Sequence, residues 1–127
     1  MLVDTTGLVL AVMVTAASLS DVAGAKLVLG RAAKAGVRVK RVWADFAYRG
    51  LAHWAEWPFR AAVAVVTRAT GQRGFAPLAR RWVVERTFAW LTKYRRLRAD
   101  YERTCPSSEA FIYVAMSHVM LRRLHRS

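Results

Sequence analysis

Two carboxylates, Asp45 and Glu85, stand where they could support metal-dependent chemistry on phosphate. Asp45 follows VRVKRVWA, in which valines alternate with basic residues as in a strand that enters the core, and in open α/β sheets ligands collect beyond the carboxyl ends of strands. Glu85 is the lone acid of RWVVERTFAW, residues 81–90. Mg²⁺ prefers oxygen ligands, and two such ions can clamp the attacking and leaving oxygens of a phosphodiester displacement.

Ordinary structural roles would explain the same two residues. Glu85 lies four residues after Arg81, so on a helix the two side chains could form an exposed pair that contributes about 0.3–0.5 kcal/mol. Asp45 could be a turn former at the end of its strand. The residue types alone leave both readings open.

Positive charge surrounds Glu85 and dominates the chain. With 21 Lys and Arg against 8 Asp and Glu, the formal net charge is +13, and residues 60–127 hold fourteen of the basic side chains and four of the acidic ones. Such a bias favours a polyanionic partner, with DNA as the expected one. The cations that we expect to contact DNA are Arg81, Arg86, Lys93, Arg95, Arg96 and Arg98.

The elements that must position these residues follow from periodicity and turn signals. Two apolar runs around Thr5–Gly7 predict a hairpin, and Ser20 with Gly36 predicts the start and end of a helix. Further elements are predicted as strands at 37–44 and 61–67, helices at 51–57, 78–103 and from Pro106 to Leu124, with Ser107 and Ser108 as caps, and a loop at 71–77. This order predicts an α/β fold with a mixed sheet covered by helices, in one domain over residues 1–127.

The predicted helix over 78–103 has two apolar sectors and therefore packs against neighbours twice. Val84, Phe88 and Leu91 form one sector, and Glu85 lies in the strip between the sectors on a basic ridge. The other sector holds Val83, Trp90, Tyr94 and Leu97. We also expect the five tryptophans, which are Trp43, Trp54, Trp57, Trp82 and Trp90, to pack mostly in the core.

The cysteine count and the apolar runs exclude several classes of protein. One cysteine, Cys105, cannot form an internal disulfide, and no Cys/His set has zinc-ligand spacing. The longest apolar run, Leu8 to Val14, is far shorter than the roughly 20 residues of a membrane span. We expect a cytoplasmic protein that does not associate with a membrane.

Three motifs carry a family resemblance over nearly the whole chain. They are WADFAYRG, RRWVVERTFAWLTKYRRLRADYER and SSEAFIYVAMSHVMLRRL. Their order and register resemble bacterial insertion-sequence transposases of the DDE class. The resemblance implies a ribonuclease-H-like fold in which Asp, Asp and Glu bind two divalent metals, Mg²⁺ or Mn²⁺, and cut and join DNA at the ends of the element. Asp45 then matches the second acid and Glu85 the third.

The resemblance also has departures. Related transposases carry Tyr-x2-Arg-x3-Glu-x6-Lys around the last acid; here Arg81 fits, whereas Leu78 and Thr92 occupy the Tyr and Lys positions and Lys93 comes one residue late. Ala47 stands where the family usually has glycine, which would strain the backbone if that position needs a positive φ.

The strand that carries the first acid in the family lies upstream of the segment that this chain matches, so the expected fold is truncated, with its first strand absent and an exposed sheet edge. Asp4 belongs to the second strand and does not replace that acid. Alone, the chain is expected to bind DNA weakly and cut none. Its partners would be a homo-oligomer or a transposase from an upstream frame. The alternative is a noncatalytic, basic nucleic-acid-binding or inhibitory partner fragment.

Overall fold

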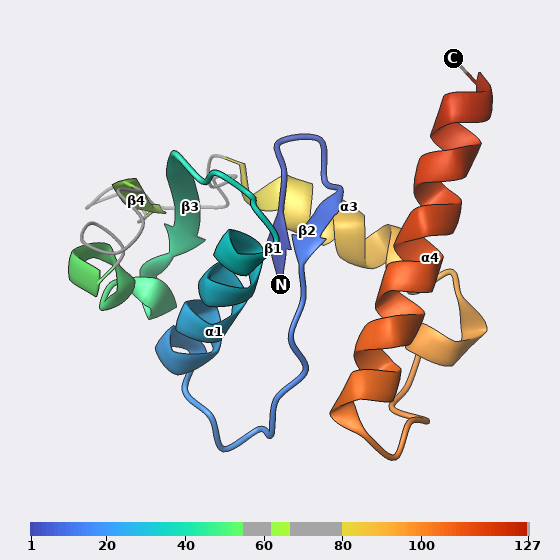
Figure 1. The fold of residues 1–127 in the computed structure, drawn as a ribbon, viewed down its shortest axis with the longest axis horizontal. Helices are drawn as coiled ribbons and strands as arrows, with labels where there is room; N and C mark the ends of the chain where they lie inside the picture. The colour runs from blue at the N-terminus through green and yellow to red at the C-terminus, as the bar shows by residue number, and fades with distance from the viewer. Residues whose placement is uncertain (55–61, 67–79, 127) are drawn as a thin grey trace, which may run out of the picture. The chain divides into compact units, whose positions relative to one another are not determined.

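The computed structural model describes residues 1–54, 62–66 and 80–126 and shows a mixed α/β chain (Figure 1). It divides into two compact units, Met1–Ala16 with Val83–Ser127, and Ala17–Trp82. The elements are β1 (Leu2–Val3), β2 (Val9–Ala11), α1 (Asp21–Lys34), β3 (Arg41–Asp45), the 3-10 helix η1 (Phe46–Tyr48), β4 (Ala62–Val66), α3 (Arg81–Leu91), the 3-10 helix η2 (Arg95–Leu97) and α4 (Cys105–Arg126). The prediction of a single domain stays a prediction.

The predicted hairpin is confirmed in the first unit. β1 pairs with β2 in antiparallel orientation, and the turn between them is closed by the hydrogen bond from Gly7 N to Asp4 O, at 3.1 Å. Gly7 has a φ of +85°, a conformation that a residue with a Cβ rarely adopts. A helix secures this turn from outside, since Thr87 Oγ1 of α3 donates to Gly7 O at 2.6 Å.

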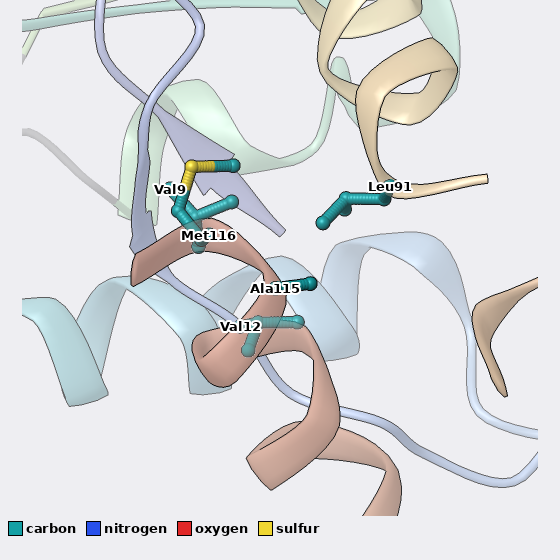
Figure 2. Close-up of a cluster of buried hydrophobic side chains, with 5 residues drawn as sticks. All are labelled: Val9, Val12, Leu91, Ala115 and Met116. Atoms are coloured by element: carbon teal, nitrogen blue, oxygen red, sulfur yellow. The ribbon is translucent and has the colours of Figure 1, made fainter. Parts of the chain in front are cut away.

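The core of the first unit joins the hairpin to two helices. Figure 2 shows its buried members, Val9 and Val12 from the hairpin strand and its extension, Leu91 from α3, and Ala115 and Met116 from α4. Partly buried apolar side chains pack around them: Met1, Val3, Leu8, Tyr94, Leu97, Ile112, Val119 and Met120. Burial of this apolar surface, at about 25 cal/mol per Å², is the main force that holds α4 against β2.

α4 also satisfies backbone groups beyond the end of β2. Val12 N donates to Tyr113 Oη at 3.2 Å, and Val14 N donates to the carboxylate of Glu109 at 2.9 Å. Glu109 is buried, so the hydrogen bond offsets the cost of removing its charge from water. The amides of Val12 and Val14 therefore have acceptors on side chains of α4, and the expectation of an exposed sheet edge stays a prediction.

The predicted long helix is wrong in its extent. α3 ends at Leu91, and Tyr94 then adopts an extended conformation with ψ of 122° before η2. Residues 92–98 contain neither Gly nor Pro, so no local signal marks this end. Tertiary contacts account for it, because the break lets Tyr94 and Leu97 pack against the core cluster, and Arg98 Nε donates to the carbonyl of Thr92 at 3.1 Å.

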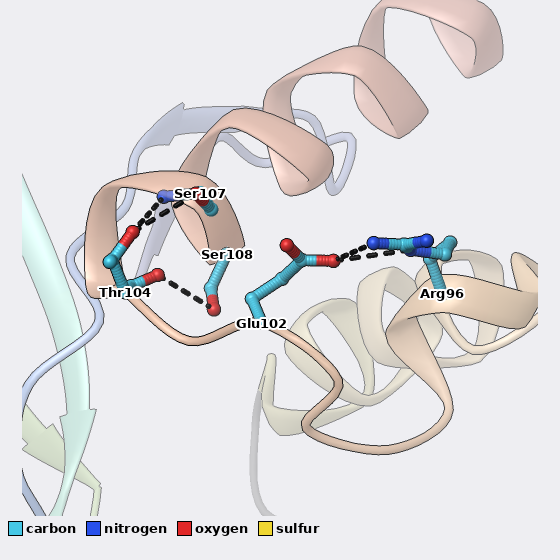
Figure 3. Close-up of polar contacts among 5 residues, drawn as sticks. All are labelled: Arg96, Glu102, Thr104, Ser107 and Ser108. Atoms are coloured by element: carbon cyan, nitrogen blue, oxygen red, sulfur yellow. Dashed lines mark hydrogen bonds and ion pairs between the residues drawn. The ribbon is translucent and has the colours of Figure 1, made fainter.

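The last helix is confirmed, but its cap differs from the prediction. α4 begins at Cys105, so Thr104 and not Ser107 or Ser108 occupies the capping position. Thr104 Oγ1 accepts from Ser107 N at 3.3 Å, as Figure 3 shows. Pro106 fits in the first turn because the first N–H groups of a helix have no partner within it.

The second unit contains the helix that the sequence predicts best. α1 spans Asp21–Lys34 and is capped by Ser20, whose side chain accepts from Ala23 N at 3.3 Å. Gly36 follows its end with a φ of +78°. Buried residues of this unit are Val28, Leu29, Ala32 and Leu51. Residues 51–54 are helical as predicted, while the rest of that helix and the predicted loop at 71–77 lie outside the described residues.

The two remaining described strands form a parallel pair. β3 pairs with β4 from Arg41 opposite Ala62 to Asp45 opposite Val66. β3 starts at Arg41 rather than at Val37, and its residues alternate between exposed and half-buried. The expected single mixed sheet is not formed among the described strands, which make one antiparallel and one parallel pair instead.

The expectation that the tryptophans pack mostly in the core is wrong for two of them. Trp43 is 38% exposed and Trp82 is 53% exposed, whereas Trp54 and Trp90 are half-buried and Trp57 lies outside the described residues. Trp43 belongs to the exposed face of β3, where the strand period of two places every second side chain away from the core.

Candidate metal and nucleic-acid site

Asp45 occupies the carboxyl end of β3 and begins the turn that follows. Its side chain is exposed and accepts a hydrogen bond from Ala47 N at 3.1 Å, which caps η1. The reading of Asp45 as a turn former is therefore correct. It does not exclude a ligand role, because an ionised carboxylate offers about four acceptor positions and this bond uses one.

The pKa of Tyr48 is affected by the negative charge near Asp45. Burial raises the pKa of Tyr48 above its ordinary value, and the charges of Asp21 and Asp45 raise this pKa further. Asp21, at the start of α1, therefore shares this region, and contacts between α1 and η1 bring it there. No spacing rule links Asp21 to Asp45, so the sequence gives no sign that the two residues share a region.

Ala47 shows no sign of the backbone strain that its replacement of a family glycine suggested. Among the described residues, Arg80 is the non-glycine residue with a positive φ, at 65°. Ala47 lies in η1, whose dihedral angles any L-residue adopts. The turn beside Asp45 therefore tolerates alanine at this position.

Glu85 lies on the exposed side of α3, on a helix whose buried residues are Val83, Thr87 and Leu91. The predicted sector of Val84 and Phe88 is wrong, since these side chains are 38% and 53% exposed. The buried face takes Thr87 instead because its hydroxyl binds Gly7 O. Asp45 and Glu85 belong to different compact units, and their convergence on one metal stays a prediction.

The predicted basic residues do not form one helical ridge, because α3 ends before most of them. Arg81 and Arg86 lie on α3, Lys93 follows it, and the others are on or directly after η2: Arg95, Arg96 and Arg98. All of these except Arg86 are exposed.

Arg86, Arg96 and Arg98 have structural contacts as well. Arg86 Nη2 donates to Thr6 O at 2.7 Å, and its guanidinium lies 5.0 Å from the ring centre of Trp90. Arg96 pairs with Glu102 through Nε at 3.1 Å (Figure 3), and Arg98 binds the carbonyl of Thr92. Their predicted roles on DNA remain predictions.

The described residues contain no group of three or more His, Cys, Asp or Glu side chains that could hold a metal ion. The oxygen donors of Asp45 and Glu85 are of the type that Mg²⁺ and Mn²⁺ prefer, so the chemistry of each side chain suits a metal ligand. No helix among the described residues has the length and hydropathy that crossing a membrane requires.

Comparison with known proteins gives the family. The family model described as "Transposase DDE domain" matches residues 1–120. The chain belongs to this family. It is also 32% identical, over 90 residues, to the "Putative transposase for insertion sequence element IS402" of Burkholderia cepacia.

That match covers 71% of this chain and 43% of the relative, so the chain spans less than half the length of the relative. No solved structure matches. Transposases of the DDE family generally use divalent metal ions, and they act on DNA.

Proposed function

We propose that this chain serves DNA transposition as the part of a DDE transposase that carries the second and third metal-binding acids, Asp45 and Glu85, on a ribonuclease-H-like fold. The match to the transposase domain over residues 1–120 carries the proposal. The exposed position of Asp45 at the end of a parallel strand supports it. The protein would act in the bacterial cytoplasm, on insertion-sequence ends, as a homo-oligomer or with a second transposase chain.

In this proposal the acidic residues bind metal and the basic residues bind DNA. Asp45 and Glu85 would hold Mg²⁺ or Mn²⁺, and the metals, when bound, would activate the attacking oxygen and stabilise the leaving one. Arg81, Arg86 and Lys93, together with Arg95, Arg96 and Arg98, would bind the DNA backbone, whose affinity for cations falls as salt rises.

Iron-directed cleavage of the protein tests whether Asp45 and Glu85 share a metal. Fe²⁺ bound in place of Mg²⁺ generates hydroxyl radicals with ascorbate and peroxide, and these radicals cut the backbone near the ion. We expect cuts near both Asp45 and Glu85 that Mn²⁺ suppresses, mapped by mass spectrometry. Asp45→Asn should remove both sets, because the shared metal would lose an oxygen ligand.

Asp100→Asn is the matched control, since Asp100 is an exposed acid outside the proposed site. It should leave the cuts unchanged. Cuts near Glu85 that persist in Asp45→Asn would refute a shared metal. A chain with no iron-dependent cuts that still binds DNA would be the noncatalytic binding fragment.

A further inference from the structure

Two guanidinium groups lie over exposed aromatic rings on either side of Asp45 along the chain. Arg80 is 4.0 Å from the ring centre of Trp43, two residues before Asp45, and Arg49 is 4.6 Å from that of Phe46, the next residue. The rings are 38% and 56% exposed. All five residues belong to the second compact unit, so their contacts lie within one described body.

The geometry of β3 brings the first pair close to Asp45. Arg41, Trp43 and Asp45 are the exposed residues of this strand, and alternate residues of a strand share a face. Two residues span about 7 Å along a strand. A phosphodiester whose phosphate approaches Asp45 would therefore place a neighbouring phosphate within reach of the guanidinium over Trp43.

Arg80 holds this position in an unfavourable backbone conformation. Its φ of 65° is in the left-handed region, which disfavours residues that carry a Cβ. Such outliers persist where other contacts determine the conformation, and they concentrate at functional sites. The positive φ of Arg80 sets the direction of its side chain. The contact between the Arg80 guanidinium and the ring of Trp43 depends on that direction.

A guanidinium group that stacks on a ring can still donate hydrogen bonds to a ligand. Its N–H donors lie in the plane of the group, so a ring on one face orients these donors without using them. Planar donors of this kind bind phosphate oxygens in pairs. Arg80 and Arg49 are also exposed, so a phosphate can reach them from solvent.

We propose that Arg80 and Arg49 are positioning residues that bind phosphates of the DNA strand on either side of the phosphodiester presented to Asp45. The exposed rings of Trp43 and Phe46 hold the two guanidinium groups in orientation. This assignment rests on the proposed function of Asp45. It adds two phosphate contacts to the predicted cations, both from the second compact unit.

DNA binding by the full 127-residue chain tests the assignment, with fluorescence anisotropy of a labelled duplex in EDTA as the measurement. Arg80→Ala and Arg49→Ala should each weaken binding about tenfold, and each should reduce the slope of log K against log salt by about 0.9. Arg38→Ala is the control, because Arg38 is exposed in the same unit. It should change affinity less than about twofold.

Two further variants separate the side chain from the fold. Arg80→Gly removes the guanidinium and relieves the strained φ, so a loss equal to that of Arg80→Ala assigns the effect to the guanidinium. Trp43→Leu keeps the charge and removes the stacked ring, and it should also weaken binding. Circular dichroism confirms that each variant is folded. Arginine variants that bind as well as Arg38→Ala would overturn the assignment.

A second arm with Mg²⁺ distinguishes this assignment from the proposed function. Mg²⁺ should strengthen binding of the wild-type chain, and Asp45→Asn should abolish that gain. A gain that survives in Asp45→Asn overturns the metal role of Asp45, and with it the positioning role. An abolished gain, with weaker binding of both arginine variants in EDTA, supports both proposals.

Discussion

Asp4 directly follows β1 and Asp45 ends β3, and both accept a hydrogen bond from the amide two residues later, yet their surroundings differ. One oxygen of Asp4 accepts from Thr6 N at 2.8 Å, Thr6 Oγ1 at 2.8 Å and Leu8 N at 2.9 Å. Asp45 accepts from Ala47 N alone among the described residues, at 3.1 Å. The first carboxylate closes the β1–β2 turn, while the second retains most of its acceptor positions.

The difference shows how to tell a structural acid from a candidate ligand. Burial raises the pKa of Asp4, but the hydrogen bonds from Leu8, Thr6 and Gly7 outweigh it, and the net pKa is lowered. These bonds use the charge of Asp4 to hold a turn that α3 also fixes through Thr87. Asp45 stabilises only a short 3-10 helix, so its charge remains available to a cation.

Gly7→Ala should have the largest effect on stability at the two turns. A Cβ at this position would lie 3.0 Å from Thr87 Oγ1, and the φ of +85° adds strain, so we expect a loss of about 2 kcal/mol. Urea denaturation measures it. Gly24→Ala is the control in α1, where a Cβ meets nothing within 4 Å and should stabilise by about 0.5–1 kcal/mol. Equal changes in stability for Gly7→Ala and Gly24→Ala would mean that neither the positive φ of Gly7 nor its closeness to Thr87 constrains the hairpin turn.

Asp4→Ala should cost more than Asp45→Ala, about 1 kcal/mol against less than about 0.5 kcal/mol, because it removes more hydrogen bonds. The contribution of Asp4 to the free energy of unfolding should also depend on pH. Since folding lowers the pKa of Asp4, its stabilisation is fully present above the ordinary value of 3.8 and is lost as pH falls through the lowered folded pKa. Urea denaturation across this range should show the wild type and Asp4→Ala converging. A constant difference would contradict the assignment.

The smallest expected effect concerns Tyr48. Folding raises its pKa, so this residue makes the fold less stable as pH rises past 10.0, where the unfolded chain ionises more readily. Asp45→Asn should lower the Tyr48 pKa, but not to its ordinary value, because burial is the larger cause. The pKa of Tyr48 is measured from tyrosinate absorbance during a pH titration, after the signal of the Tyr48→Phe variant is subtracted to remove the other tyrosines. Asp100→Asn should leave the pKa unchanged, and a pKa that ignores Asp45 would remove this carboxylate from the surroundings of Tyr48.

Much of the local structure could be predicted because its signals lie within a few residues. Ser20 and Gly36 bound α1 within a residue of the prediction, and the turn at Thr5–Gly7 closes the hairpin. Asp45 was assigned correctly to the end of its strand. Family membership was likewise predicted from the order of three motifs, which the match over residues 1–120 confirms.

The sequence by itself determined the caps, the turns, the charge and the family, because each is written in neighbouring residues. Only the tertiary structure decided that α3 ends at Leu91, that Thr87 and not Phe88 is buried, and that Trp43 lies exposed beneath Arg80. The physical reason is that these outcomes depend on partners far along the chain. A hydroxyl that binds a carbonyl 80 residues away, or a ring that meets a distant guanidinium, leaves no mark in local periodicity.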